Sequence, residues 1–258
     1  MTNAHFRSLH RAGQPLVLPN AWDAASARLI EEAGAAAVAT TSAGVAWSLG
    51  AGDGGTIGQR AAIDLVARVV ATVNVPVTAD VEDGYGDIDG TIRGIGDAGA
   101  VGVNLEDGLA TPEEHADRIR AARDAGDLFV NARIDTYLRA LGDPATRFQN
   151  TLDRAAAYVA AGADGIFVPG VADPETIAKL AKEISAPLNV MAGPGSPTVG
   201  ELAALGVARV SVGPAITLAA YAATRAAARE LLTKGTYDAL DADLGFGETD
   251  ALMGHPHG

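Results

Sequence analysis

A junction recurs along this chain in which an amphipathic run ends in glycine and a short apolar run begins almost at once. Its five clearest copies are Glu-Ala-Gly34 before AAAVATTS, Asp-Ala-Gly99 before AVGVNLED, Asp-Ala-Gly126 before DLFVNARID, Ala-Ala-Gly162 before ADGIFVPG and Ala-Leu-Gly206 before VARVSVGP. Glycine readily adopts the left-handed conformation that ends many helices. Apolar runs without polar alternation are typical of parallel strands covered on both faces. Each junction therefore predicts a helix, a tight turn and a buried parallel strand.

The same pattern, extended across the gaps, predicts eight strand–helix units. Strands are expected at 15–21, 36–42, 75–82, 101–107, 128–135, 164–170, 187–193 and 209–213. Helices are expected at 23–33, 57–73, 87–98, 112–125, 144–161, 173–184, 198–205 and 215–234. Consecutive right-handed crossovers without a hairpin signal favour an α/β fold of the closed (β/α)₈ TIM-barrel type, with an open doubly wound sheet as the alternative.

The chain of 258 residues fits one large domain. We expect residues 1–237 to form the barrel with its C-terminal helix, and residues 238–258 to form a loosely ordered tail. The helix expected at 215–234 is rich in alanine and spreads apolar residues over more than one face, which exceeds what packing on a barrel requires.

Composition excludes several classes of protein. The absence of cysteine excludes a disulfide framework, a thiolate zinc site and a thiol nucleophile. The balance of 19 Lys and Arg against 32 Asp and Glu gives a net charge of −13, which disfavours nucleic acid as a partner. No basic N-terminal stretch precedes an apolar run, and no window holds about 18 uninterrupted apolar residues. We expect a soluble cytoplasmic protein without a membrane partner.

Acidic residues follow several of the predicted strands. The third strand ends in TADVEDGYG with Asp80 and Glu82, the fourth in VNLEDG with Glu106 and Asp107, and the Gly-rich loop after the second carries Asp53. Active sites of such barrels form at the C-terminal ends of the strands. Crowded carboxylates repel one another unless a cation lies among them, and ligands that are all oxygen favour Mg²⁺ or Mn²⁺. These residues therefore predict a metal site.

Other candidates surround this predicted metal site. Arg133 ends the fifth strand in VNARIDTY, where it would bind a carboxylate or phosphate with two hydrogen bonds. Trp22 borders the expected mouth and is a substrate-binding candidate, although a lone tryptophan is more often a packing residue. His115 is expected on the surface of its helix rather than as a general base. Asp87 is expected to cap the next helix.

Several of these motifs together resemble a known family. LPNAWDAASARLIEEAG, the TTSAG turn, TADVEDGYG, VNLED and VNARID, in this order and spacing, are similar to the isocitrate lyase and phosphoenolpyruvate mutase superfamily from about Leu16 to Pro214. The resemblance implies a (β/α)₈ barrel that binds Mg²⁺ and a 2-oxo acid or its enolate. The expected chemistry is cleavage or formation of a bond at the carbon beside the carbonyl.

The resemblance also implies a role for each matching residue. Asp80 would be the direct metal ligand, with Glu82, Glu106 and Asp53 holding the water shell of the metal. The turn of Ser42, Ala43 and Gly44 would bind the substrate carboxylate, and Arg133 would contact the substrate. Mg²⁺ held by carboxylate and keto oxygens would stabilise the negative charge of the developing enolate.

The chain departs from the family pattern in places that matter. Lyases of the family carry a mobile loop with a Lys-Lys-Cys-Gly-His type motif after strand four, whereas this chain passes from Asp107 to Pro112 with no cysteine anywhere. Gly170 stands where the lyases carry a glutamate, and Thr40 stands where they carry a tyrosine. These departures predict a mouth that keeps its metal and carboxylate side and is more open and less polar on the other.

These observations favour a Mg²⁺-dependent lyase that cleaves a C–C bond of a small 2-oxo acid or dicarboxylate, such as oxaloacetate, by decarboxylation or retro-aldol chemistry through a metal-bound enolate. Arg133, Asp53 and Tyr85 are the catalytic candidates, with water or Tyr85 returning the proton. The alternatives are C–P chemistry of the phosphoenolpyruvate mutase or phosphonopyruvate hydrolase type, and a 2-oxo acid binding protein with little turnover. Because terminal helices in this superfamily are often exchanged between subunits, an exchanged helix and a homo-oligomer, a dimer or tetramer, are expected.

Overall fold

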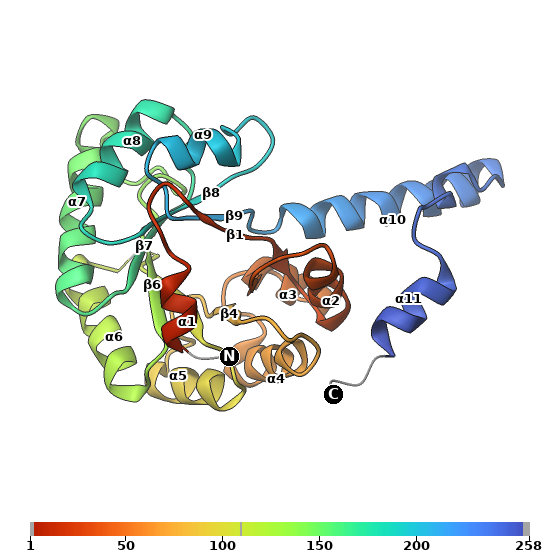
Figure 1. Ribbon diagram of the computed structural model, residues 1–258, viewed down its shortest axis with the longest axis horizontal. Helices are drawn as coiled ribbons and strands as arrows, with labels where there is room; N and C mark the ends of the chain where they lie inside the picture. The colour runs from red at the N-terminus through yellow and green to blue at the C-terminus, as the bar shows by residue number, and fades with distance from the viewer. Residues whose placement is uncertain (1–2, 109, 255–258) are drawn as a thin grey trace.

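The computed structural model describes residues 3–108 and 110–254, and its centre is one sheet of short parallel strands (Figure 1). The strands are β1 (Leu16–Leu18), β2 (Asn20–Ala21), β3 (Val38–Thr40), β4 (Val77–Asp80), β5 (Gly102–Glu106), β6 (Phe129–Arg133), β7 (Gly165–Val168), β8 (Leu188–Met191) and β9 (Arg209–Ser211). Pro19 separates β1 from β2, and β1 pairs with β9 while β2 pairs with β3. The sheet thus closes into a barrel, as predicted, and the open-sheet alternative is excluded.

Helices follow the strands and agree with the eight predicted ranges. They are α2 (Ala24–Glu32), α4 (Gly58–Val70), α5 (Ile88–Asp97), α6 (Pro112–Ala125), α7 (Pro144–Ala160), α8 (Pro174–Glu183), α9 (Val199–Ala204) and α10 (Ala215–Lys234). Four short elements were not predicted: α1 (Asn3–Ser8), α3 (Ser42–Ser48), the 3₁₀ turn η1 (Asp238–Leu240) and α11 (Phe246–Met253). One or two helical turns are too short for a hydrophobic period to show in the sequence.

Side chains at the helix starts fix the lengths of the connections after the strands. The Thr111 hydroxyl accepts from the N–H of Glu114, and the Glu114 carboxylate accepts from the N–H of Thr111, so that this capping box starts α6. Asp87 caps α5 as predicted, accepting from the N–H of Gly90 at 3.0 Å. Because β5 ends at Glu106 and α6 begins at Pro112, only residues 107–111 connect them.

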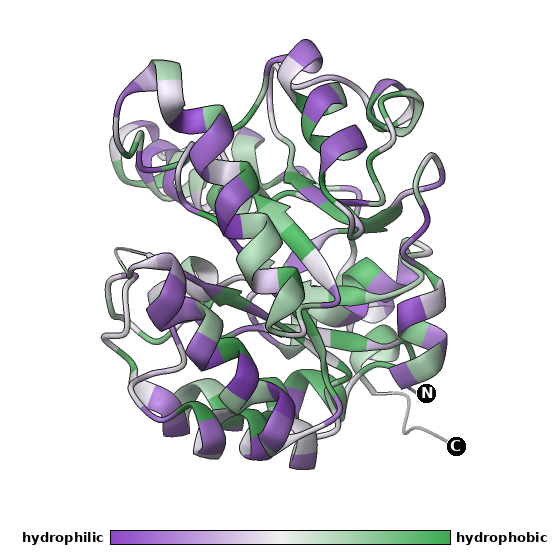
Figure 2. Ribbon diagram, turned by 90° about the vertical axis from the view of Figure 1, so that its left-hand side faces the viewer, coloured by the Kyte–Doolittle hydropathy of each residue, from purple (hydrophilic) through white to green (hydrophobic). Residues whose placement is uncertain are grey.

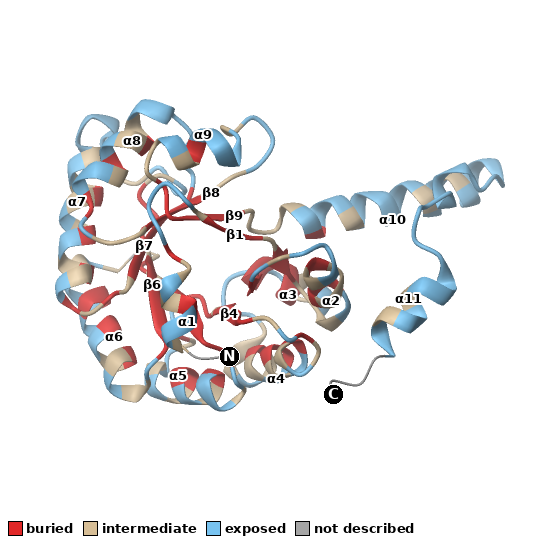
Figure 3. Ribbon diagram, in the orientation of Figure 1, coloured by how far each residue is buried: buried red, intermediate tan, exposed pale blue. Residues whose placement is uncertain are grey.

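The barrel strands and the inner faces of the helices form the core. Figure 3 shows the strands buried and the outer helix faces exposed, and in Figure 2 the hydrophobic residues follow the strands. α1 closes the N-terminal end of the barrel, where Phe6 is fully buried and packs edge-on against Phe129 at 5.5 Å between ring centroids. Loops lie at the opposite, C-terminal end of the strands.

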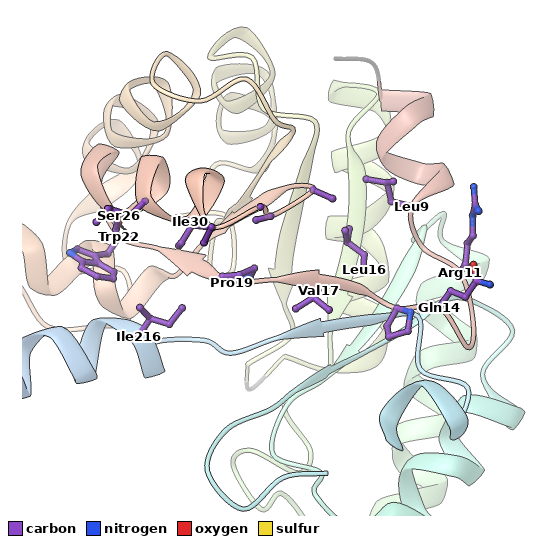
Figure 4. Close-up of a pocket in the computed structure, with 16 residues that line it drawn as sticks. Leu9, Arg11, Gln14, Leu16, Val17, Pro19, Trp22, Ser26, Ile30 and Ile216 are labelled. Carbon is purple, nitrogen blue, oxygen red and sulfur yellow. Dashed lines mark hydrogen bonds between the residues drawn. The ribbon is translucent and has the colours of Figure 1, made fainter. Parts of the chain in front are cut away.

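The last long helix, α10, extends away from the barrel (Figure 1). Thr217 is the one residue of this helix that is buried, and Leu232 is 84% exposed. Beside it, Val17 on the outer face of β1 is 41% exposed. An apolar groove of about 800 Å³ lies there, with Val17, Trp22 and Ile30 among its lining residues (Figure 4). In the described part of the chain, no helix covers the outer face of β1 as one normally would on a barrel strand.

The segment expected to be a loose tail begins at Asp238. Its described part forms η1 and α11, with mostly exposed side chains, and residues 255–258 lie outside the described residues. Arg28 Nε of α2 donates to the carbonyl of Leu252 at 3.2 Å, which places α11 beside α2. Within residues 3–108 and 110–254, no helix is both long enough and apolar enough to cross a membrane.

Candidate active site

A cavity of about 190 Å³ lies at the C-terminal ends of the strands, where barrel active sites form. Five of the residues predicted from the sequence line it: Ser42, Ala43, Asp53, Asp80 and Arg133. They come from the start of α3, the loop after it, and the ends of β4 and β6. The closed sheet thus brings together side chains that lie far apart in the sequence.

The remaining predicted acids line a neighbouring cavity of about 540 Å³. Glu82, Tyr85 and Glu106 all border this second space. The two cavities meet at an ion pair, because Arg133 lines the first and its Nη1 lies 2.6 Å from Oε2 of Glu106. The acidic residues therefore flank one continuous charged region rather than a single point.

Asp80 lies at the floor of the smaller cavity. Its Oδ1 accepts from the N–H of Glu82 at 3.2 Å, and its own N–H donates to Oγ1 of Thr40 at 3.0 Å. Burial raises the pKa of Asp80 above its ordinary value, the charge of Arg133 opposes that shift, and Asp53 adds to it. A cation beside this carboxylate would relieve the cost of its ionisation.

Two more carboxyl groups nearby also have raised pKa values. Burial, with repulsion from Asp80 and then Asp53, raises the pKa of Glu82 to about 7. Burial also raises the pKa of Glu106 to about 7, against the opposing charge of Arg133. Glu82 is only 6% exposed, its Oε1 has no protein partner among the described residues, and its φ is 52°. A buried, strained carboxylate with one oxygen that accepts from no described protein donor fits a site for a cation.

The donor set fits Mg²⁺ held largely through water. Among the described residues, no three His, Asp or Glu side chains converge closely enough to hold a metal by themselves. Mg²⁺ commonly keeps several waters and uses one or two protein carboxylates, with oxygen as its preferred donor. As expected from the sequence, Asp80 would be the direct ligand, and Glu82, Glu106 and Asp53 would accept hydrogen bonds from the water shell of the metal.

Arg133 is held rigidly at the edge of the smaller cavity. Its Nε donates to Oδ1 of Asp135 at 2.7 Å and its Nη2 to Oδ2 at 3.2 Å, while Nη1 pairs with Glu106. Burial opposes the charge of Arg133, but Asp80, Glu106 and Asp135 together raise its pKa above the ordinary value. A guanidinium has five N–H donors, so some remain for an anionic ligand.

Asp107 borders the larger cavity and, with His115, belongs to a buried cluster of side chains. Asp107 accepts from the Tyr158 hydroxyl at 2.8 Å and pairs with Arg154 at 2.7 Å. The expectation that His115 lies on the surface was wrong: it is fully buried, with its ring 4.6 Å from that of Tyr158. Burial lowers the pKa of His115 to about 3. The helical pattern placed it on α6 but did not reveal that this face packs against α7.

Three predicted residues lie away from the smaller cavity. A side chain at Gly44 would come within 2.6 Å of Thr217 Oγ1 and 2.9 Å of Trp22 Cβ, so this position faces α10. Trp22 lines the apolar groove of Figure 4 and packs edge-on near Tyr221, so its position does not support substrate contact. Tyr85 borders the larger cavity, and burial followed by the charge of Glu82 raises the pKa of its hydroxyl.

The opposite side of the smaller cavity is apolar. Its lining there comes from Leu138, Phe167, Pro169, Met191 and Pro214. Gly170 has a φ of 84°, and a Cβ at this position would lie 2.7 Å from the backbone N of Leu138. The loop after β6 therefore occupies the space that a side chain at 170 would need. The prediction of a less polar side agrees with this lining, but at Gly170 the loop fills the space that was expected to be more open.

Sequence reasoning missed several polar residues of the cavity. Asn20, Asn104 and Ser211 line it, and Asp135 orients Arg133. A signal was present, because asparagine follows an apolar residue at matching places in VNLED, VNARID and LNVM. Because these strands were predicted to be uniformly apolar, the asparagines that point into the barrel were not predicted.

Comparison with known proteins gives a consistent result. The family model "phosphoenolpyruvate phosphomutase" matches residues 6–232. An uncharacterized protein of Mycobacterium tuberculosis is 41% identical over 230 residues, 86% of this chain and 87% of its own. Oxaloacetate decarboxylase of Pseudomonas entomophila is 29% identical over 240 residues, 85% of this chain and 81% of its own.

A solved structure shares the fold over nearly the whole chain. Phosphonopyruvate hydrolase in complex with oxalate and Mg²⁺ superimposes with a TM-score of 0.86 at 26% identity, covering 98% of this chain and 95% of that one. The related proteins with named activities are lyases, mutases, a decarboxylase and hydrolases. From its closed barrel, its acidic strand ends and the match over residues 6–232, this chain belongs to the isocitrate lyase and phosphoenolpyruvate mutase superfamily.

Proposed function

We propose that this protein is a Mg²⁺-dependent enzyme that cleaves a C–C bond beside the carbonyl of a small 2-oxo acid, with decarboxylation of an oxaloacetate-like dicarboxylate as the leading reaction. The observation that carries this proposal is the cavity in which Asp80, Asp53 and Arg133 face a common space of about 190 Å³. That volume lies below the roughly 300–1,000 Å³ of pockets for drug-sized ligands, so the substrate is small.

Each side of the cavity has a role in binding. Arg133, held by Asp135 and Glu106, would bind a carboxylate of the substrate through its remaining N–H groups. Ser42 and Ala43 lie in the first turn of α3, where backbone N–H groups lack intrahelical acceptors, and would bind a second anionic oxygen. Mg²⁺, when bound near Asp80, stabilises negative charge that develops on the keto oxygen.

The short connection after β5 favours decarboxylation over reactions that need a dedicated acid or base. Residues 107–111 leave no room for a long loop carrying a proton donor over the cavity. Loss of CO₂ needs no base to begin, so it tolerates this gap best. Tyr85 is a poor source of the returning proton, because it borders the other cavity and its pKa is raised. Water therefore becomes the preferred donor.

The lining of the cavity does not favour C–P chemistry. Transfer of a phosphoryl group calls for several cations around its oxygens. Arg133 is the one Lys or Arg among the described residues lining the smaller cavity, and three of its nitrogens already meet carboxylates. Arg118 and Arg139 border the larger cavity instead.

A panel of 2-oxo acids and 2-hydroxy diacids tests the proposal. Each compound is incubated with the protein in Mg²⁺ or in EDTA, with binding measured by calorimetry and products identified by NMR. The expected result is Mg²⁺-dependent release of CO₂, or of a smaller oxo acid, from at least one dicarboxylate. Binding without turnover of any compound would favour a binding protein, and phosphate release from phosphonopyruvate would favour C–P chemistry.

We further propose that the protein is a homo-oligomer in which α10 of one copy covers the groove beside β1 of another. The helix has one buried residue, and the groove exposes the outer face of β1 where a barrel helix would normally pack (Figure 4). Leu218 and Tyr221 of α10 are partly exposed apolar side chains that suit this groove. Light scattering should give a dimer or tetramer, and a monomer of 26.1 kDa would contradict the proposal.

A further inference from the structure

The interior of the barrel holds a chain of polar side chains beneath the smaller cavity. Asn104, Asn131, Asn189 and Arg209 are each at most 4% exposed. They come from β5, β6, β8 and β9, and strand pairing places Asn104 opposite Asn131 and Asn189 opposite Arg209. Buried polar groups are costly unless hydrogen-bonded, so a chain of them inside a barrel calls for a physical explanation.

One end of this chain is fixed by backbone carbonyls. Asn189 Nδ2 donates to the carbonyl of Val190 at 2.8 Å and to that of Arg209 at 3.2 Å, so its Oδ1 faces the other way. That Oδ1 accepts from Asn131 Nδ2 at 3.0 Å. The same Nδ2 of Asn131 donates to Oδ1 of Asn104 at 2.9 Å. Because carbonyls only accept, the direction of every amide in the chain follows.

The other end is fixed by a group that can only donate. Arg209 Nη2 donates to the same Oδ1 of Asn104 at 3.0 Å. Arg209 is fully buried, and its Nε and Nη1 have no protein acceptor among the described residues. Two donors thus converge on one oxygen of Asn104, and a flip of that amide would set Nδ2 against both of them.

This arrangement leaves the Nδ2 group of Asn104 for the cavity. Asn104 lines the smaller cavity. Its Oδ1 accepts hydrogen bonds from Asn131 and Arg209, and its Nδ2 donates to no described protein group. Pairing of β4 with β5 sets Asn104 directly beside Asp80. A neutral donor therefore lies next to the carboxylate at the floor of the cavity, where a ligand oxygen bound near Asp80 would come within its reach.

We propose that Asn104 donates a hydrogen bond from Nδ2 to an anionic oxygen of the bound 2-oxo acid, and that Arg209 and Asn131 are positioning residues that lock its amide in this orientation. This inference rests on the proposed function, since it assumes an oxyanion beside Asp80. It adds a direct contact from β5 to those expected from Arg133 and the start of α3. It also gives the buried guanidinium of Arg209 a role in ligand recognition.

Oxalate is the probe for this contact because it is a stable dicarboxylate that does not turn over. Calorimetry with saturating Mg²⁺ compares the wild type with Asn104→Asp, which keeps the acceptor for Arg209 and removes the donor. Affinity for oxalate should fall about 10- to 100-fold, the range for one hydrogen bond to a charged group. Binding of Mg²⁺ alone should not weaken. Asn74→Asp, an exposed change of the same charge, is the matched control and should leave oxalate affinity unchanged.

A second variant separates the lost donor from the added charge. Asn104→Leu brings no charge and should also weaken oxalate binding at least about tenfold. Should it fail to fold, Asn104→Ser takes its place, because the hydroxyl can still accept from Arg209 but is too short to reach the ligand. Wild-type affinity for oxalate in Asn104→Leu would overturn the proposal. The loss of affinity in Asn104→Asp would then come from repulsion between the new carboxylate and oxalate.

Arg209→Met tests the positioning role. It should weaken oxalate binding about 3- to 10-fold in the wild type and have no further effect in Asn104→Asp, because both act through one amide. Full additivity would show that Arg209 acts only through general stability and would overturn that role. Absence of Mg²⁺-dependent oxalate binding in the wild type would instead refute the proposed function, and this inference with it. Normal wild-type binding that survives in Asn104→Asp refutes the inference alone.

Discussion

The two sides of the barrel mouth differ in how their side chains are held. From β3 to β6, charged groups constrain one another: Arg133 is held by Asp135 and Glu106, and Asp80 lies beside Asn104. From β7 to β9, the lining is mostly apolar, with Ser211 as a polar exception, and it is shaped by backbone where Gly170 packs against the loop at Leu138. The first side can bind charge and the second sets size and shape. The contrast suggests that the chemistry belongs to the first side and substrate selection to the second.

The largest expected effect comes from removing the proposed metal ligand on the charged side. In Asp80→Ala, Mg²⁺-dependent binding of oxalate should fall below detection by calorimetry, because Asp80 is the proposed direct ligand of the metal. Asp89→Ala removes the same charge from an exposed position on α5 and should bind as the wild type does. Retained affinity in Asp80→Ala would mean that the ligand binds elsewhere.

A second prediction tests whether the charged side is a mutual network. Arg133→Met leaves Glu106 and the fully buried Asp135 with Arg139 as their only cationic partner among the residues that the structure describes. Breaking a buried ion pair typically costs about 3–5 kcal/mol of unfolding free energy, and the loss here should approach the lower end because Arg139 remains. Denaturant unfolding provides the measurement, with Arg60→Met on exposed α4 as the control. A loss under about 0.5 kcal/mol would show that the network is not coupled.

A third prediction concerns the apolar side. Gly170→Ala would bring a Cβ within 2.7 Å of the Leu138 backbone at a φ of 84°. We expect a loss of about 1–3 kcal/mol in unfolding free energy, from steric overlap and backbone strain together. Gly193→Ala is the matched control, since a Cβ there meets nothing within 4 Å. Equal stability of the two variants would show that the loop at Leu138 does not shape this side.

The smallest expected effect is a dependence of Mg²⁺ binding on pH. The pKa values of Glu82 and Glu106 are raised from 4.5 to about 7 in the metal-free protein. Their contribution to stability is therefore full below about pH 4.5 and is lost as pH rises through about 7. Mg²⁺ favours the ionised groups, so its affinity should rise about tenfold between pH 6 and 8. The increase in melting temperature on adding Mg²⁺, followed across this range, measures it.

Glu82→Gln supplies the control for the pH dependence. It removes one of the two titrating groups without changing the shape of the side chain, so the rise in Mg²⁺ affinity should become shallower. An equally steep rise in this variant would assign the pH dependence to other groups.

The fold was predictable because its signals are local and repeated. Gly162, with a φ of 106°, follows the end of α7 at Ala160 and precedes the buried strand β7, which begins at Gly165. Left-handed glycines also follow α2, α5 and α9, whereas Gly126 after α6 is extended, with a φ of −175°. The short helices α1 and α3 were not predictable, because neither is long enough to show a period. The alanine-rich sequence of α10, with apolar residues on more than one face, indicated contacts beyond the barrel, and the helix does extend away from it (Figure 1).

The candidate site was predictable only in part. Asp80 and Arg133 mark strand ends in the sequence, and the structure brings both to one cavity. Asp135 and Asn104 were missed because their roles depend on which side chains face them across neighbouring strands, and a single strand does not reveal its partners. Trp22 was misplaced for the same reason: its strand leads to the mouth, but its ring faces the outer groove.

The most direct test of the central claim is the position of a bound divalent cation. Crystals grown with Mn²⁺ and oxalate would locate the metal by its anomalous scattering. We expect a single strong peak about 2.1 Å from a carboxylate oxygen of Asp80, with oxalate extending from it toward Arg133. A peak far from Asp80, or oxalate bound without a metal, would contradict a Mg²⁺-dependent site at the strand ends of this barrel.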